Sequence, residues 1–263
     1  MPSQIPAGQT APDLREAIRL EEEIHSASPE ALLSAASSSS LTDDLALVLL
    51  NRADLPAECL VALSKNQSVS KFRKIRMAIV EHLHTPRHVS LPMLRLLYTF
   101  DLMQVALTPV VAADIKRAAE ELLLAKLETI SAGEKLTLAR RASGRIAAEL
   151  LLANEPRVMQ AALENPRLTE SSVAKVLARK NTSAALVQAV CHHPKWSLSR
   201  DIRIALLRND KTPLARALEF ARWIPATLLR EILQNSRLPH KTKACLLREA
   251  EQSSYTQRRP ATH

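Results

Sequence analysis

The sequence predicts an all-α protein, and within that class an α-solenoid, a superhelix of stacked short helix pairs with a repeat of about 28 residues. Three observations support this prediction. Leu and Ala dominate the 263 residues, aromatic residues make up only 3%, and there are only 3 Gly residues, a composition that favours helices over sheets. Short apolar stripes with helical spacing recur along the chain. The breaks between these stripes share one pattern, in which Asn or His is followed by Pro, Thr or Ser.

The break in "LLRNDKTPLARAL", Leu206 to Leu218, illustrates this pattern. Asn tolerates the left-handed conformation that ends many helices, and Thr212 before a proline is a helix-start signature. We therefore expect Asn209, and Asn181 one repeat earlier, at helix C-termini with φ at or near positive values. Related breaks occur in "VEHLHTP", "ALENPRLTE" and "ILQNSRLP".

A shift of 28 residues superimposes 154–181 on 182–209 without a gap. The apolar stripes of the two copies then coincide, and Thr169 aligns with Ser197 as a second expected N-cap. Helices this short cannot bury an apolar stripe alone, so neighbouring copies have to stack. The sequence therefore predicts a solenoid whose repeat is shorter than those of the common helical-repeat families.

The same shift applies in the first half of the chain, where Thr42, an expected N-cap, aligns with Ser70. The run Ser37 to Ser40, which resembles a low-complexity linker, then falls in a repeat turn. We expect one solenoid domain over residues 11–251 with an irregular middle at about 87–132, flanked by disordered residues 1–10 and 252–263.

Four segments carry a resemblance to a known group: "LARRASGRIAAELL", "ALENPRLTE", "HPKWSLSRDIRIALLRNDKTPLARALEF" and "SLPMLRLLYTFDLMQVALTP". They resemble uncharacterised bacterial proteins built from HEAT-like or leucine-rich-repeat-variant helical units, over most of residues 30–248. This resemblance implies a right-handed α-solenoid of the bacterial cytoplasm and no particular activity. The chain is also similar in size, helical build and basic charge to HEAT-like DNA glycosylases that remove alkylated bases. Those enzymes place aromatics beside an Asp and an Arg; here Trp196 lies near Asp201 and Arg203, without a matching motif.

The net charge of +9 is unevenly distributed. Residues 1–132 hold 13 Lys and Arg against 16 Asp and Glu, whereas residues 133–263 hold 23 against 11. This excess in the second half predicts an anionic partner, with an ordinary solvated surface as the alternative. The three widely spaced cysteines, the lack of a signal-peptide pattern and the lack of a long apolar run favour a cytoplasmic location without a membrane span.

The densest basic cluster is Arg140, Arg141 and Arg145 around Gly144. Guanidinium groups beside a glycine could hold a phosphate or carboxylate; the alternative is a solvated helical turn in which Gly144 accommodates tight helix packing. Basic residues also coincide under the shift of 28, in the pairs Arg167/Lys195, Lys175/Arg203 and Lys180/Arg208. The expected anion- or partner-binding surface comprises Arg140, Arg141, Arg145, Arg167, Lys175, Lys195 and Arg203.

Other conspicuous residues are expected to be structural. Trp196 aligns with apolar residues that precede N-caps, so we expect it to be buried as a hydrophobic staple. The string "CHHP" has no second Cys/His cluster with zinc spacing, so Cys191 is expected in the core and His193 in a turn. In "LYTFDLMQ", Phe100 and Met103 are expected in the core.

No phosphate-binding loop, nucleophile elbow or dinucleotide fingerprint occurs in the sequence, so no catalytic, cofactor-binding or metal-binding residue is predicted. The leading hypothesis is a non-enzymatic helical-repeat scaffold that binds a protein or peptide on its curved surface. The alternative is a nucleic-acid-binding protein, or a HEAT-like glycosylase acting on alkylated bases, that uses the basic second half.

Overall fold

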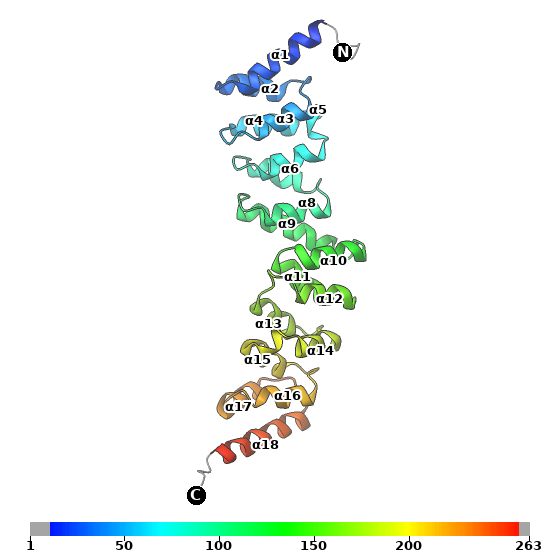
Figure 1. The fold of residues 1–263 in the computed structure, drawn as a ribbon, viewed down its shortest axis with the longest axis vertical. Helices are drawn as coiled ribbons and strands as arrows, with labels where there is room; N and C mark the ends of the chain where they lie inside the picture. The colour runs from blue at the N-terminus through cyan, green and yellow to red at the C-terminus, as the bar shows by residue number, and fades with distance from the viewer. Residues whose placement is uncertain (1–10, 258–263) are drawn as a thin grey trace, which may run out of the picture. The chain divides into compact units, whose positions relative to one another are not determined.

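A computed structural model of the chain describes residues 11–257. These residues form helices joined by short turns and contain no strand, which confirms the all-α class. They group into two compact units, unit 1 (Met1–Glu128) and unit 2 (Thr129–His263). Figure 1 shows the helices, coloured by residue number. Unit 1 carries the 13 basic and 16 acidic residues of the first half, and unit 2 carries the 23 and 11 of the second, because residues 129–132 are uncharged.

Unit 1 is a series of mostly short helices. They are α1 (Ala11–His25), α2 (Pro29–Ser37), α3 (Asp43–Leu50), α4 (Ala57–Lys65), α5 (Gln67–Ser70), α6 (Arg73–Glu81), α7 (Arg87–Leu94), α8 (Thr99–Leu107) and α9 (Ala113–Lys126). Along one side of the unit, α2 packs on α4, α4 on α6 and α6 on α8, so that each helix contacts the next but one. Leu60, Ile75 and Leu102 are fully buried between these layers.

Unit 2 has the same construction. Its helices are α10 (Ala132–Arg141), α11 (Gly144–Leu150), α12 (Pro156–Leu163), α13 (Glu170–Ala178), α14 (Ala184–His192), the 3₁₀ turn η1 (Trp196–Leu198), α15 (Arg200–Arg208), α16 (Leu214–Ala221), α17 (Ala226–Gln234) and α18 (His240–Gln257). One row contains α11, α13, α15 and α17, and a second row contains α10, α12 and α14, each helix packing on the next in its row. Leu177, Leu206 and Leu229 are fully buried in the first row.

Local signals set several helix starts. The hydroxyl groups of Thr42 and Thr169 accept hydrogen bonds from N–H groups in the first turns of α3 and α13, as expected of N-caps. The expectation that Ser197 is an N-cap is wrong, and Ser70, which aligned with Thr42, is not an N-cap either. Ser197 lies inside η1 and Ser199 caps α15, while Ser70 is the last residue of α5. The run Ser37 to Ser40 lies at the end of α2 and in the short turn before α3, so it does not form an extended linker.

The recurrent Asn or His at the helix ends has a structural role. The Nδ2 group of Asn165 donates to the carbonyl groups of Ala139 (2.7 Å) and Ala142 (3.1 Å) in the preceding layer, and its Oδ1 accepts from the Arg167 N–H (2.8 Å). Asn66 makes the same set of bonds in unit 1. Carbonyl groups in the last turn of a helix have no partner within that helix. A turn side chain with both a donor and an acceptor therefore links adjacent layers and shapes its own turn.

Asn209 belongs to this series, and its backbone differs from the expectation. It is the C-cap of α15, as predicted, but its φ is −91° and its ψ is 132°, so the predicted positive φ is wrong. Asn181 lies in the turn after α13, whose C-cap is Arg179. The N-caps Thr169 and Ser199 are 30 residues apart, whereas the turn residues Asn165 and His193 are 28 apart. Asn is favoured at these turns for its hydrogen bonds.

The last described helix overlaps one of the terminal segments that the sequence predicted to be disordered. Helix α18 continues to Gln257 and so includes the start of the expected tail from Gln252, while residues 1–10 and 258–263 lie outside the described residues. Among the helices of the described part, none combines the length and apolar character that crossing a membrane requires.

Candidate functional site

A groove of about 660 Å³ runs along α13 and α15 in unit 2. Its floor is formed by the small and apolar side chains of Ala174, Ala178, Ile204 and Ala205, which are at least partly exposed, above the fully buried Leu177. Small residues at these positions keep the space between the two helices open. The groove therefore offers an apolar surface that an extended chain could cover.

Three basic residues line one end of this groove. Lys180 follows α13, Arg208 ends α15, and Arg237 lies in the turn after α17. The side chains of Lys180 and Arg208 are exposed and have no hydrogen-bond or ion-pair partner within the described part of the chain. Their charges are therefore available to an anionic ligand.

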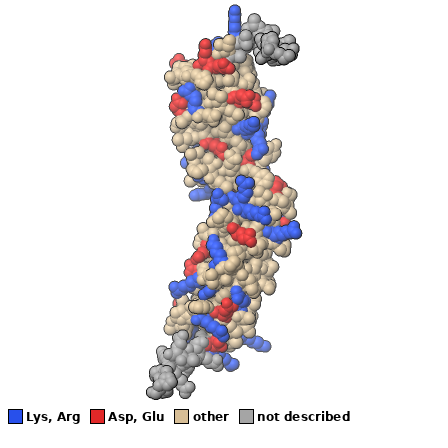
Figure 2. Space-filling view, in the orientation of Figure 1, with Lys and Arg blue, Asp and Glu red and all other residues tan. Residues whose placement is uncertain are grey.

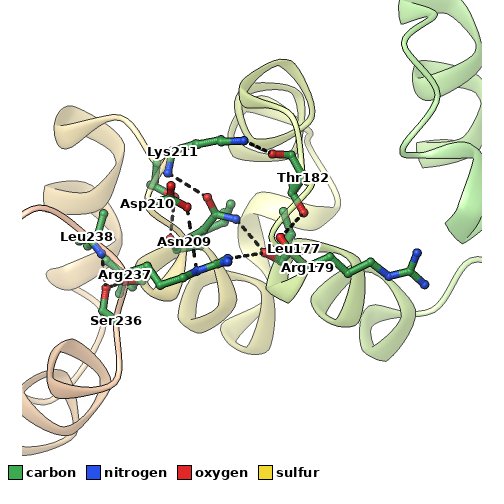
Figure 3. A network of polar contacts seen from close by, with 12 residues as sticks. Leu177, Arg179, Thr182, Asn209, Asp210, Lys211, Ser236, Arg237 and Leu238 are labelled. Carbon is green, nitrogen blue, oxygen red and sulfur yellow. Dashed lines mark hydrogen bonds and ion pairs between the residues drawn. The ribbon is translucent and has the colours of Figure 1, made fainter.

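Arg237 is held in place by several contacts (Figure 3). Its Nη2 lies 3.5 Å from the carbonyl oxygen of Leu177 at the end of α13, and its Nε lies 4.0 Å from a carboxylate oxygen of Asp210. The Arg237 N–H also donates to the Arg208 carbonyl at 3.0 Å. The Arg237 side chain thus reaches from the turn before α18 to the end of α13, and its guanidinium lies at the basic end of the groove.

The opposite end of the groove carries different groups. Ser171 and Asp201 lie in the first turns of α13 and α15 and line the groove there. The two helices are parallel and in register. At their N-terminal ends the Ser199 hydroxyl contacts the Glu170 carboxylate at 2.9 Å, and at their C-terminal ends Asn209 Nδ2 donates to the Leu177 carbonyl at 2.7 Å. The groove consequently has a carboxylate at one end and cations at the other.

The predicted arginine cluster lies elsewhere in unit 2. Arg140 and Arg141 end α10, and Arg145 is the second residue of α11; all three are exposed. A Cβ atom on Gly144 would lie 2.3 Å from the backbone carbonyl oxygen of Arg167, so Gly144 serves the close approach of two chain segments. The Arg167 guanidinium in turn donates to the Arg141 carbonyl at 3.1 Å. The structure therefore brings Arg141 and Arg167 together, and Gly144 permits the close packing that this requires.

Arg145 also has an acidic neighbour. Hydrogen bonds from Arg179 lower the pKa of Glu149, and the positive charge of Arg145 contributes in the same direction. Part of the positive charge expected to face a ligand is therefore compensated within the protein. In the view of Figure 2, Lys and Arg side chains are interspersed with Asp and Glu over the face that is shown.

The remaining predicted cations are Lys195, in the turn before η1, Lys175 on α13 and Arg203 on α15. The Lys195 ammonium lies 4.0 Å from the centroid of the Trp196 ring, in the turn before η1. Lys175 lies six residues after its N-cap and Arg203 only four after its own, so the two are not equivalent as the shift of 28 suggested. The Arg203 Nε donates to the Ser197 carbonyl at 2.7 Å. The side chains of Lys175 and Arg203 thus occupy different positions in the helices α13 and α15.

Trp196 is buried, with 1% of its surface exposed, which confirms that expectation. Its Nε1 donates to the Leu163 carbonyl at 2.9 Å and so satisfies a helix-end carbonyl of the preceding layer. It lies three residues before the N-cap Ser199, so it does not occupy the staple position. Trp223 is 72% exposed, and the Arg203 guanidinium lies 5.6 Å from the centroid of its ring.

The other structural expectations are largely confirmed. Cys191 is buried, and His193 is the C-cap of α14 with its Nδ1 accepting the Lys195 N–H at 3.2 Å. Burial lowers the pKa of His193 and raises that of Cys191 to about 11. Met103 is buried, whereas Phe100 is exposed, so the core expectation for Phe100 is wrong. Within the described range, no group of three or more His, Cys, Asp and Glu side chains could hold a metal ion.

Comparison of the chain with protein-family models, with curated proteins and with solved structures finds no match in any of the three. The geometry of the groove is therefore the basis for a functional conclusion.

The sequence contained part of this site. The coincidence of Lys180 with Arg208 under the shift of 28 identified two of its three cations. Arg237 and Ser171 were missed, and Asp201 was considered only with Trp196 and Arg203, because the register drifts after Asn209 and because a groove depends on which helix faces meet. The small residues Ala174 and Ala178, four apart on one face of α13, were the remaining signal for an open surface.

Proposed function

We propose that this chain is a non-enzymatic α-solenoid scaffold of the HEAT-like type, and that it binds an extended segment of a partner protein in the groove along α13 and α15. The packing of each helix on the next but one within both units supports the solenoid part of this proposal. Stacked helix pairs commonly present extended grooves to partner chains.

The observation that carries the binding proposal is the composition of the groove. An apolar floor with polar groups at its ends is typical of peptide-binding surfaces, in which apolar contact provides affinity and charges set orientation. No aromatic side chain lines this groove, and Asp201 would repel phosphate groups. Single-stranded nucleic acid is bound chiefly by stacking on aromatic rings along a basic channel, so a peptide suits this groove better.

A peptide library displayed on phage and selected on the immobilised protein tests this function. Ala178 lies in the groove and Ala185 lies on α14 outside it, and both are exposed. Selected peptides should bind the Ala185→Trp variant as well as the wild type and should fail to bind Ala178→Trp, in which an indole fills the groove. Failure to enrich any peptide, or equal binding by both variants, would contradict the proposed function.

A second candidate function is nucleic-acid binding through the basic surface of unit 2. The 23 basic against 11 acidic residues, together with the exposed Trp223 next to Arg203, favour this candidate. Labelled duplex and single-stranded oligonucleotides should then bind at 50 mM salt and lose most of their affinity at about 200 mM. The triple variant Arg140→Ala, Arg141→Ala and Arg145→Ala should weaken this binding, and no binding at low salt would eliminate the candidate.

A further inference from the structure

We infer that the groove along α13 and α15 selects an extended peptide carrying an acidic side chain and a basic side chain three residues apart. This inference rests on the proposed function and specifies the ligand of the same groove. The acidic side chain is held by Arg208 and its basic neighbours, and the basic side chain is held by Asp201.

The opposite charges lie at opposite ends because α13 and α15 are parallel. A hydrogen bond from Ser199 to Glu170 joins the N-terminal ends of the two helices, and a hydrogen bond from Asn209 to the Leu177 carbonyl joins their C-terminal ends. Asp201 is the second residue of α15 and Arg208 is its last, so the charge reverses over the length of one short helix. A uniformly acidic ligand would meet a carboxylate at one end of the groove.

The separation of the charges sets the spacing in the ligand. Asp201 and Arg208 are seven residues apart on one helix, which corresponds to about 10.5 Å along its axis at ~1.5 Å per residue. In a polyproline II chain, residues i and i+3 point to the same side and are about 9.3 Å apart. An acidic and a basic residue at i and i+3 therefore reach both ends of the groove at once.

The helix dipoles explain part of this pattern, since acidic residues are favoured at helix N-termini and basic residues at C-termini. They do not explain Arg237, which comes from the turn before α18 and reaches the same basic end. Its long contacts with the Leu177 carbonyl (3.5 Å) and Asp210 (4.0 Å) place the guanidinium beside the groove in the absence of a ligand. A cation placed in this way loses less side-chain freedom when a carboxylate binds.

Four labelled peptides test the inference by fluorescence anisotropy against the full chain. Two carry the paired charges in either order, Ala-Glu-Pro-Ala-Lys-Ala and Ala-Lys-Pro-Ala-Glu-Ala; the controls are the same peptides with two Glu or with two Gln. Because exposed ion pairs are individually weak, we expect one paired-charge peptide to bind about tenfold more tightly than both controls. Peptides selected from the displayed library should show the same spacing of opposite charges.

A change of specificity separates recognition from a structural effect. In the Asp201→Lys variant the groove is basic at both ends, so preference should move from the paired-charge peptide to the peptide with two Glu. Arg208→Gln should weaken the binding of every peptide that contains Glu. Glu231, on the exposed surface of α17 outside the groove lining, provides the matched control, and Glu231→Lys should leave the preference unchanged. Circular dichroism of each variant checks that it is folded.

The outcomes distinguish this inference from the proposed function. If library peptides bind and are excluded by Ala178→Trp but show no paired charges, or if Asp201→Lys does not change the preference, the inference is wrong and the function stands. If no peptide binds in a groove-dependent way, the proposed function fails and the inference with it. If an oligonucleotide occupies the groove and is excluded by Ala178→Trp, the ligand class is nucleic acid and the inference is overturned.

Discussion

Replacing Asn209 tests the role assigned to the turn residues. The side chain is 1% exposed, its Nδ2 donates to the Leu177 carbonyl at 2.7 Å, and its Oδ1 accepts the Lys211 N–H at 2.9 Å. In Asn209→Ala the Leu177 carbonyl keeps only the contact with Arg237 at 3.5 Å. Two lost hydrogen bonds of about 1 kcal/mol each, plus the penalty for buried groups left unpaired, give a loss of about 2–4 kcal/mol in the free energy of unfolding.

Two further variants test whether the hydrogen bonds of Asn209 are the source of this loss of stability. His82 occupies a similar turn after α6, where its Nδ1 accepts the His84 N–H at 3.2 Å and its Nε2 lies 2.9 Å from the Arg52 carbonyl. Asn209→His should therefore lose less stability than Asn209→Ala. Asn235 is exposed and makes only a 3.5 Å contact with its own helix, so Asn235→Ala should change stability by less than about 0.5 kcal/mol.

Urea unfolding followed by circular dichroism measures these differences, with the slope of the transition checked for each variant. The reasoning would be refuted if Asn209→Ala lost no more stability than Asn235→Ala. It would also be refuted if Asn209→His were as damaging as Asn209→Ala, because the two bonds would then not be the source of the effect.

Three other substitutions have defined outcomes. Trp196→Ala should lose about 3–5 kcal/mol of stability in the same urea assay, whereas Trp223→Ala, at an exposed position, should lose almost none; similar losses would contradict the burial difference. Gly144→Ala should lower the melting temperature because its Cβ would meet a backbone oxygen at 2.3 Å, while Gly133→Ala, with nothing within 4 Å, should leave it unchanged or raise it. Burial lowers the pKa of His193 below its ordinary value of 6.5, so the unfolded state binds more protons and stability should fall as pH decreases through about that value. His193→Asn, which places an amide where the neighbouring turn already has one, should reduce this dependence in unfolding measured across pH, and an unchanged slope would show that His193 is not its source.

The sequence by itself determined the helical class and several of the helix boundaries. Thr42 and Thr169 cap helices because a hydroxyl group and the next N–H groups lie within a few residues of one another. The burial of Trp196 also followed from its place in an apolar pattern. These features depend on short stretches of chain, so local composition and spacing are sufficient to predict them.

Only the tertiary structure decided how the turns and the groove work. The conformation of Asn209 depends on the Leu177 carbonyl, which is 32 residues away in the sequence, so no local rule predicted its negative φ. The drift in spacing between 28 and 30 residues puts Lys175 and Arg203 at different positions of their helices, and Arg237 reaches the groove through a contact with a residue 60 positions away in the sequence. Helix propensity acts within a turn or two of backbone, whereas a binding surface requires side chains from successive layers to converge. Their convergence is set by the packing distances between layers, and a one-dimensional pattern does not contain those distances.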